Sequence, residues 1–173
     1  MYDCLKIIPD VLSDLEINEI IKDTLPNVSK QNVVQFAQPV GYEGIKKAPC
    51  IDHRLIPQLI GRLGFSRDQL DVASFMFYAE GSENNPHADN CIFENGQIKQ
   101  IKPWTHTAVI FLNDNFTGGT LVYPKQGCSF TSIPGNCVIA SAGAEYPHYV
   151  TPVLSGNRFT LVLRLIVQID PLN

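Results

Sequence analysis

The chain holds four histidines, and one of them, His87, lies two residues before Asp89 in the segment NNPHADN. In extended backbone, side chains at positions i and i+2 point to the same face, so this imidazole and this carboxylate can reach one ion. An H-x-D pair also arises by chance, and a solvated loop shaped by Pro86 would account for it equally well. The pair indicates a metal site only if a further ligand comes from elsewhere in the chain.

His148 can supply that ligand from the start of a predicted strand far downstream. Two histidines and one carboxylate form a facial triad, which suits Fe(II) and leaves three coordination positions open. The remaining histidines, His53 and His106, are predicted to be structural or exposed. A closed zinc site would need four protein ligands, often thiolates. No C-x-x-C spacing occurs, so we expect reduced thiols at Cys4, Cys50, Cys91, Cys128 and Cys137.

Arg158, ten residues after His148, meets a second chemical requirement. A keto acid that chelates a metal through one carboxylate leaves its far carboxylate in need of a fixed cation, and a guanidinium fork matches that geometry. The intervening Ser155-Gly156-Asn157 is typical of a hairpin turn, which would return Arg158 beside the strand that carries His148. Alone, Arg158 would be interpreted as a surface charge on a strand. Together with the triad, it is predicted to anchor a dicarboxylate.

Helical signals occupy the first third of the chain. A capping box at Ser13 predicts a helix that runs to about Leu25, where Pro26 should end it. A second amphipathic helix is predicted over about 52–63. We expect residues 1–69 to form a helical and mixed support for the remainder.

From about residue 70, short apolar runs rich in β-branched and aromatic residues alternate with turn clusters. This pattern predicts strands at 71–78, 105–113, 120–123, 129–133, 137–140, 148–152 and 158–168. Strands without helical patterns between them favour an antiparallel barrel or jelly roll, and periodicity alone leaves barrel and sandwich open. The polar segment 90–100 is predicted as a mobile loop that could act as a lid.

The length of 173 residues predicts one domain over 1–173, and the 45% hydrophobic content predicts a packed core. A net charge of −4 argues against a nucleic-acid surface, which would need a basic stripe. Neither a secretory leader nor an apolar run long enough to span a membrane is visible, so a soluble, cytoplasmic protein is expected.

Around the candidate ligands the sequence resembles the 2-oxoglutarate/Fe(II) dioxygenases, in their prolyl 4-hydroxylase-like branch. The resemblance covers about 72–167. YAEGSENNPHAD, from Tyr78 to Asp89, matches the family pattern Y-x-x-G-x-x-x-x-P-H-x-D at every fixed position, and HYVTPVLSGNR matches H-x-V-x-x-V-x-x-G-x-R. Between them, TAVIFLNDNFTGGTLVYP is similar to the family's T-x-x-x-Y-L-N-D segment with its following G-G-x-T-x-F-P.

The resemblance implies a double-stranded β-helix, a jelly roll, over 70–173. It implies that the iron ligands are His87, Asp89 and His148. It also implies that Arg158 anchors the C5 carboxylate of 2-oxoglutarate, with Tyr78 and Thr107 as further co-substrate contacts. Fe(II) is the implied cofactor, 2-oxoglutarate and O₂ are the co-substrates, and ascorbate is a further candidate.

Four departures from the family pattern bear on the acceptor. Asn84 stands where a Tyr is usual, and Phe111 replaces the Tyr of Y-L-N-D. Leu121 follows Thr120, where the family places Thr-Val or a similar pair. Arg164 occupies a position that a Trp beside the substrate pocket commonly holds. Trp104 either borders the substrate opening or packs at its rim. These departures leave the iron and co-substrate assignments in place and weaken the assignment of a prolyl acceptor.

The sequence therefore predicts a dioxygenase that hydroxylates an unactivated C–H. The preferred acceptor is a prolyl residue in a peptide or protein. Hydroxylation of a free amino acid or another small molecule is the alternative within the enzyme class. A metal-binding jelly roll without catalysis, or a purely structural β-domain, remains the alternative outside it.

Overall fold

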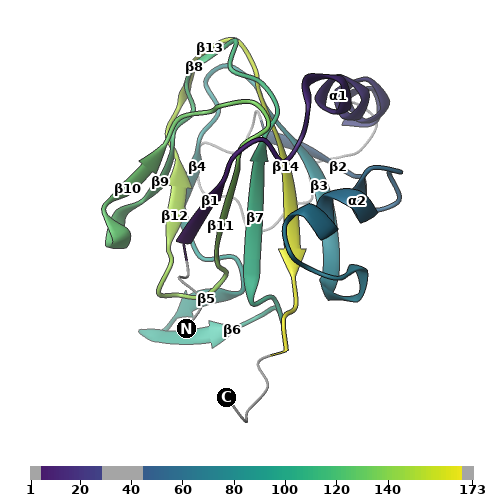
Figure 1. Ribbon diagram of the computed structural model, residues 1–173. Coiled ribbons are helices and arrows are strands. Elements are labelled where there is room, and N and C mark those ends of the chain that lie inside the picture. The colour runs from purple at the N-terminus through teal and green to yellow at the C-terminus, as the bar shows by residue number, and fades with distance from the viewer. Residues whose placement is uncertain (1–4, 29–44, 169–173) are drawn as a thin grey trace.

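The computed structural model describes residues 5–28 and 45–168 and shows two antiparallel sheets with a shared core between them (Figure 1). The larger sheet has six strands, in the order β1 (Leu5–Ile8), β11 (Cys137–Ser141), β7 (His106–Phe111), β14 (Arg158–Leu165), β3 (Leu70–Tyr78) and β2 (Ile45–Pro49). The smaller sheet has the order β10 (Cys128–Phe130), β9 (Leu121–Tyr123), β12 (His148–Val150) and β4 (Asn84–His87). Two short ladders pair β8 (Thr117–Gly118) with β13 (Val153–Ser155) and β5 (Cys91–Glu94) with β6 (Gln97–Gln100). The predicted mainly β fold with a jelly-roll core is confirmed.

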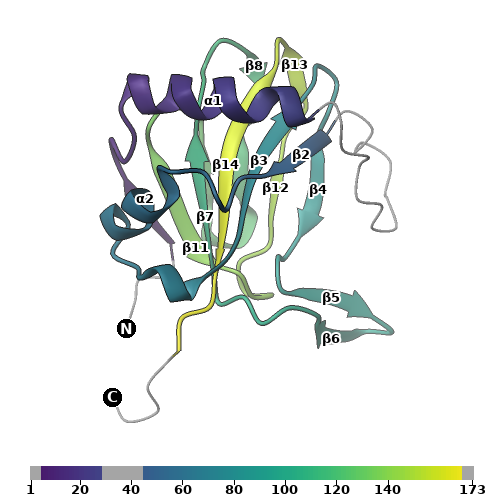
Figure 2. The same ribbon diagram turned by 90° about the vertical axis from the view of Figure 1, so that its right-hand side faces the viewer.

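Both helices cover the outer face of the larger sheet, on the side turned to the viewer in Figure 2. They are α1 (Asp14–Val28) and α2 (Ile56–Arg62), and single 3₁₀ turns occupy Arg67–Gln69 and Pro124–Gln126. The sequence did not predict that the first third also contributes strands. β1 and β2 form the two edges of the larger sheet. β1 pairs with β11 and β2 pairs with β3, so each joins the sheet through a strand from the later part of the chain.

Helix α1 begins at the predicted capping box. The amide of Ser13 donates to Glu16 Oε2 at 2.9 Å, and the amide of Glu16 donates to Ser13 Oγ at 3.4 Å. The predicted end before Pro26 is wrong, because the helix continues through Pro26 to Val28. A proline in the last turn removes one backbone hydrogen bond. Burial of Val28, which is 3% exposed, offsets that loss.

The second helix is shorter than predicted and starts only at Ile56. The amide of Ile56 donates to the carbonyl of His53 at 3.0 Å, and the amide of Leu55 donates to Nδ1 of the same histidine at 3.3 Å. Residues 53–56 therefore form a turn that feeds the helix. Arg62, in the last turn of α2, donates to both carboxylate oxygens of Glu16, at 2.7 and 2.9 Å, and so joins α2 to α1.

The segment 90–100 is a hairpin of β5 and β6 instead of the predicted mobile loop. Its two-residue turn consists of Asn95 (φ 52°) and Gly96 (φ 77°). Positive φ at both positions is the geometry that matches the twist of a tight hairpin, and Asn-Gly is the pair that adopts it most readily. The hairpin projects from the lower edge of the molecule in both ribbon views (Figures 1 and 2).

Side chains of strand β14 point alternately to the core beneath the helices and to the core between the two sheets. Leu161, Leu163 and Leu165 face the helices and belong to the helix-side core, whereas Val162 belongs to the core between the sheets. Since side chains alternate along a strand, Arg158, Thr160 and Arg164 share the inner face with Val162. The residues between the sheets include polar ones, and those polar residues form the candidate site.

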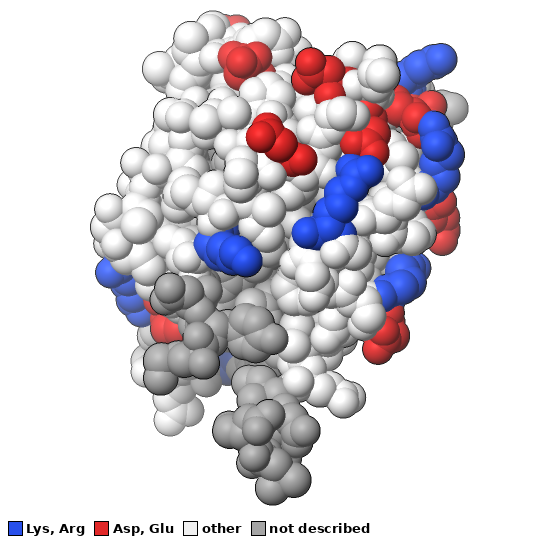
Figure 3. Space-filling model, in the orientation of Figure 1, with Lys and Arg blue, Asp and Glu red and all other residues white. Residues whose placement is uncertain are grey.

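On the face seen in Figure 3, acidic and basic side chains are interspersed. Within the described ranges, none of the helices combines the length and apolar character needed to cross a membrane.

Leu161→Ala should lower the free energy of unfolding by about 2–5 kcal/mol, because Leu161 is fully buried and the truncation leaves a cavity. Leu15→Ala is the matched control: Leu15 is 82% exposed on α1, and a change within about 0.5 kcal/mol is expected. Urea denaturation monitored by circular dichroism measures both. Equal effects of the two substitutions would contradict the core assignment.

Candidate metal and co-substrate site

His87 and His148 lie side by side on neighbouring strands of the smaller sheet. Strands β4 and β12 are antiparallel neighbours in which these two residues are direct partners, and their ring centroids are 4.5 Å apart. Asp89 follows β4 by two residues, with Oδ1 3.6 Å from Nε2 of His87 and Oδ2 3.7 Å from Nε2 of His148. The ligand atoms of all three residues lie within 4.8 Å of one another. The structure thus brings together the three residues that the sequence proposed as a triad.

Hydrogen bonds orient both imidazoles toward a common point. Nδ1 of His87 lies 2.8 Å from the carbonyl of Asn85, and Nδ1 of His148 lies 3.2 Å from the carbonyl of Tyr146. A carbonyl accepts only, so each Nδ1 carries the ring hydrogen and each Nε2 presents a lone pair. Metal-binding histidines in proteins are commonly held in this way.

Both oxygens of Asp89 also have donors. Thr107, on β7, donates its hydroxyl to Oδ2 at 2.6 Å, and Arg164, on β14, donates Nη2 to Oδ1 at 2.7 Å. Burial alone would raise the pKa of Asp89, but Arg164 and the two histidines more than offset it and hold that pKa far below its ordinary range. Burial lowers the pKa of His148 to about 4. Near pH 7 the site therefore offers one carboxylate and a neutral His148 imidazole, the forms that bind a divalent cation.

Arg158 lies at the start of β14 and is 1% exposed. None of its three guanidinium nitrogens has a hydrogen-bond partner among the described residues. Its Cζ lies 4.9 Å from the ring centroid of Tyr78 and 5.8 Å from that of Phe111. A Cβ at position 119 would approach Arg158 Cδ to 2.8 Å, so Gly119, with φ +61°, leaves the room that this side chain occupies. Burial lowers the pKa of Arg158, and nearby Tyr78 acts in the opposite direction.

Further buried polar atoms without partners lie on the strands around this arginine. Within the described residues they include Tyr123 Oη, Thr160 Oγ1 and Asn84 Oδ1. Tyr123 is fully buried, and its ring centroid is 5.1 Å from that of His148. An unpaired buried polar group costs about 1–3 kcal/mol, so a cluster of such groups indicates a place for a polar ligand. Arg158, the unpartnered hydroxyls of Tyr123 and Thr160 and the triad are together suited to holding a metal and a polar anionic ligand side by side.

Sequence reasoning had named Tyr78 and Thr107 as co-substrate contacts. The structure places Tyr78 against Arg158 and Thr107 on Asp89. It also adds Tyr123 and the contact of Arg164 with Asp89, which no motif spacing indicates. The register of β14 against β7 could have suggested the second addition, because Arg164 pairs directly with Thr107.

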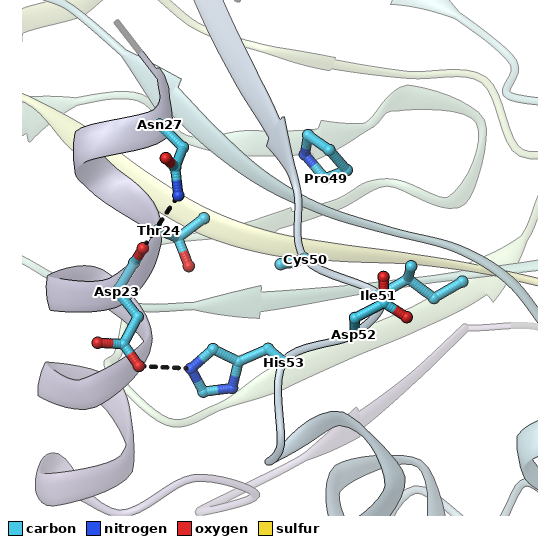
Figure 4. Close-up of a pocket in the computed structure, with 8 residues that line it drawn as sticks. All are labelled: Asp23, Thr24, Asn27, Pro49, Cys50, Ile51, Asp52 and His53. Atoms are coloured by element: carbon cyan, nitrogen blue, oxygen red, sulfur yellow. Dashed lines mark hydrogen bonds and ion pairs between the residues drawn. The ribbon is translucent and has the colours of Figure 1, made fainter. Parts of the chain in front are cut away.

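A second group of possible ligands lies on the helix side, and two of its residues, Asp23 and His53, line a surface pocket of about 230 Å³ (Figure 4). The group consists of Glu19 and Asp23 on α1 and His53, whose Nε2 is 3.4 Å from Asp23 Oδ2. His53 has the opposite tautomer from the two triad histidines, because its Nδ1 accepts a hydrogen bond from the amide of Leu55. Nε2 therefore carries the ring hydrogen, so it offers no lone pair to a metal, and it has no hydrogen-bond partner among the described residues. This group is therefore less suited to binding a metal than the triad is.

No protein-family model and no curated protein matches the chain. Solved structures do match. The viral collagen prolyl hydroxylase of Paramecium bursaria Chlorella virus-1, in its 2-oxoglutarate complex, has a TM-score of 0.71 at 13% identity, over 96% of this chain and 98% of that one.

Two further neighbours point to the same group of proteins. A prolyl 4-hydroxylase of Pseudomonas putida has a TM-score of 0.68 at 18% identity, over 96% of this chain and 94% of that one. A prolyl hydroxylase of Trichoplax adhaerens, in complex with a hypoxia-inducible-factor peptide, has a TM-score of 0.66 at 16% identity, over 95% and 84%. The chain has the fold of the 2-oxoglutarate/Fe(II) oxygenases.

Proposed function

We propose that this protein is an Fe(II)- and 2-oxoglutarate-dependent dioxygenase that hydroxylates an unactivated C–H bond. His87, Asp89 and His148 would hold the iron, and Arg158 would bind the C5 carboxylate of 2-oxoglutarate. The observation that carries the proposal is the Arg158 guanidinium, buried between the sheets with no hydrogen-bond partner among the described residues, in the same interior as the triad. A metal-binding module without catalysis has no need for a buried cation placed to bind a dicarboxylate.

When bound, iron, 2-oxoglutarate and O₂ would supply the oxidation: one oxygen atom enters the substrate C–H and the other enters succinate, with release of CO₂. The chain's own residues bind and orient. The two histidines are fixed by their Nδ1 contacts, and Thr107 and Arg164 fix the plane of the Asp89 carboxylate. The apolar walls of the inner core exclude water around them and include Leu121, Val150 and Val153.

For the acceptor, we propose a prolyl residue in a peptide or protein. This proposal is supported by structural neighbours that are described as prolyl hydroxylases, one of them in complex with a peptide. A free amino acid or other small molecule is the alternative. We also propose a reducing, cytoplasmic location, which the free thiols of the four described cysteines support.

Metal binding should depend on the triad and not on the helix-side group. His148→Ala should weaken Mn(II) binding at least about 100-fold, because loss of outer contacts alone costs 10- to 100-fold at such sites. His53→Ala is the matched control and should bind Mn(II) as the unaltered protein does. Equilibrium dialysis followed by metal analysis measures both. Loss of binding in the control alone would transfer the metal site to α1.

Binding of 2-oxoglutarate should depend on Arg158. Arg158→Gln in the Mn(II)-loaded protein should raise the Kd about 30- to 1000-fold, since truncating one partner of a buried charged pair costs about 2–4 kcal/mol. Arg54→Gln, at a side chain 72% exposed, is the control. Isothermal titration gives both constants, and Mn(II) affinity should be unchanged in each variant. An unchanged 2-oxoglutarate affinity in Arg158→Gln would favour the non-catalytic metal-binding module.

The class of acceptor, peptide or free amino acid, should be revealed by which compound stimulates the formation of succinate. Proline-containing peptides are expected to stimulate the Fe(II)-loaded protein more than free amino acids do, because the neighbours described as prolyl hydroxylases include one in complex with a peptide. Succinate measured by mass spectrometry, together with the mass increase of the acceptor by one oxygen atom, checks this. Stimulation by free amino acids alone would replace the peptide acceptor with the small-molecule one.

A further inference from the structure

A second arginine, Arg164, lies partly buried on the inner face of β14, six residues beyond the one assigned to 2-oxoglutarate. Six residues of strand span about 20 Å, so Arg158 and Arg164 mark two separate places along the interior. Arg164 donates Nη2 to the metal-ligand candidate Asp89, while its Nη1 is buried without a hydrogen-bond partner among the described residues. One edge of this guanidinium is therefore free to receive another acceptor beside the metal position.

The indole ring of Trp104 contacts both Arg164 and a second cation, Lys102. Arg164 Cζ lies 5.5 Å from its ring centroid, and Lys102 Nζ lies 5.6 Å from it. Asn90, next to Asp89, fixes this segment: its side chain donates to the carbonyl of Trp104 at 2.8 Å, and its own carbonyl accepts the amide of Lys102 at 3.1 Å. The segment that carries Lys102 is thus held to the residue that follows a metal-ligand candidate.

Lys47 on β2 is the third cation of the group. In the register of the larger sheet, Lys47 pairs with Met76, and Met76 pairs with Thr160 of β14. Directly paired residues point to the same face, so Lys47 faces the interior together with Thr160 and Arg164. It is partly buried, and its pKa is lowered by burial and then by the positive charges of Arg164 and Lys102. Lys102 and Arg164 lie over the same indole ring, and Lys47 lies on the same inner face as Arg164, so the three positive charges form one group.

The contacts place two acidic groups, Asp71 and Asp89, beside these three cations, and the hydrogen bond from the neutral indole leaves Asp71 to offset one positive charge. Asp71 accepts the indole N–H of Trp104 at 2.6 Å. Asp89 is the remaining one, and a bound divalent cation would neutralise it. We call Lys47, Lys102 and Arg164 the cationic rim. When a metal is bound, the negative charge of Asp89 is neutralised by the metal, so the positive charges of the cationic rim exceed the negative charges beside them. An incoming anion would offset that excess.

We propose that the cationic rim binds a carboxylate of the acceptor substrate, so that the enzyme selects acceptors with an acidic group near the carbon that is hydroxylated. This inference rests on the proposed function. Arg164 both positions Asp89 and offers Nη1, whereas Lys47 and Lys102 act on the substrate alone. The carboxylate can come from an acidic residue next to the reacting one in a peptide, or from the α-carboxylate of a free amino acid.

The test measures binding to the full chain loaded with Mn(II) and 2-oxoglutarate, so it needs no turnover. Three labelled peptides are identical except that Glu, Gln or Lys flanks a central proline, and fluorescence anisotropy gives their Kd values. L-Proline and L-prolinamide, as competitors, separate the two sources of the carboxylate. The variants are Lys47→Gln with Lys102→Gln, which leave Asp89 and Arg164 intact. Lys46→Gln is the matched control, because Lys46 is the exposed neighbour on the opposite face of β2.

The Glu peptide is expected to bind about tenfold more tightly than the Gln peptide, and the double variant should reduce that ratio to within about twofold. Lys46→Gln should keep it. Preference for L-proline over L-prolinamide, lost in the same double variant, would support the rim with a small-molecule acceptor. Equal binding of all probes to the unaltered protein, or a preference that survives the double variant, overturns the inference. Failure of 2-oxoglutarate binding would instead count against the proposed function, since that binding is measured separately and depends on Arg158.

Discussion

A carboxylate and two guanidiniums lie between two largely apolar sheets, and the cost of keeping these charges from water constrains the rest of the structure. Moving an unpaired charge into a protein interior costs several kcal/mol. Asp89 meets this cost through Thr107 and Arg164. Arg158 meets only part of it, through the faces of Tyr78 and Phe111. The uncompensated part is the structural reason to expect a bound dicarboxylate there.

The outer core makes that arrangement possible. Tightly packed leucines and isoleucines between the larger sheet and the helices stabilise β14 and its neighbours, so the inner face of the same strands can carry polar groups. Stability and chemistry thus occupy opposite faces of one sheet. The helices contribute by burying the outer face, whereas the candidate site is built on strands and on the segments that follow them.

Much of this could be predicted from the sequence, because local signals agreed with the fold. Alternation in RFTLVLRL and the turn before Arg158 indicated a strand, and three motifs in order indicated the jelly roll. The hairpin of β5 and β6 was missed although Asn95-Gly96 is a strong turn signal, because its strands have only four residues each and their apolar side chains, Ile92, Phe93 and Ile98, are exposed instead of facing a core. Partners contributed by distant strands, such as Thr107 for Asp89, depend on sheet register, which no local pattern contains. The continuation of α1 past Pro26 depends on the burial of Val28, a tertiary effect.

The alternation of β14 has a consequence for how the protein can fail. A slip of one residue in the pairing of β14 with β3 would turn Arg158 and Arg164 into the leucine-rich layer beneath the helices and turn Leu161 and Leu163 toward the metal ligands. Such a state would lose both anion-binding groups and both cores at once. The triad lies on β4, on β12 and just after β4, so the correct register of β14 is a condition for binding an anion beside the metal more than for holding the metal itself.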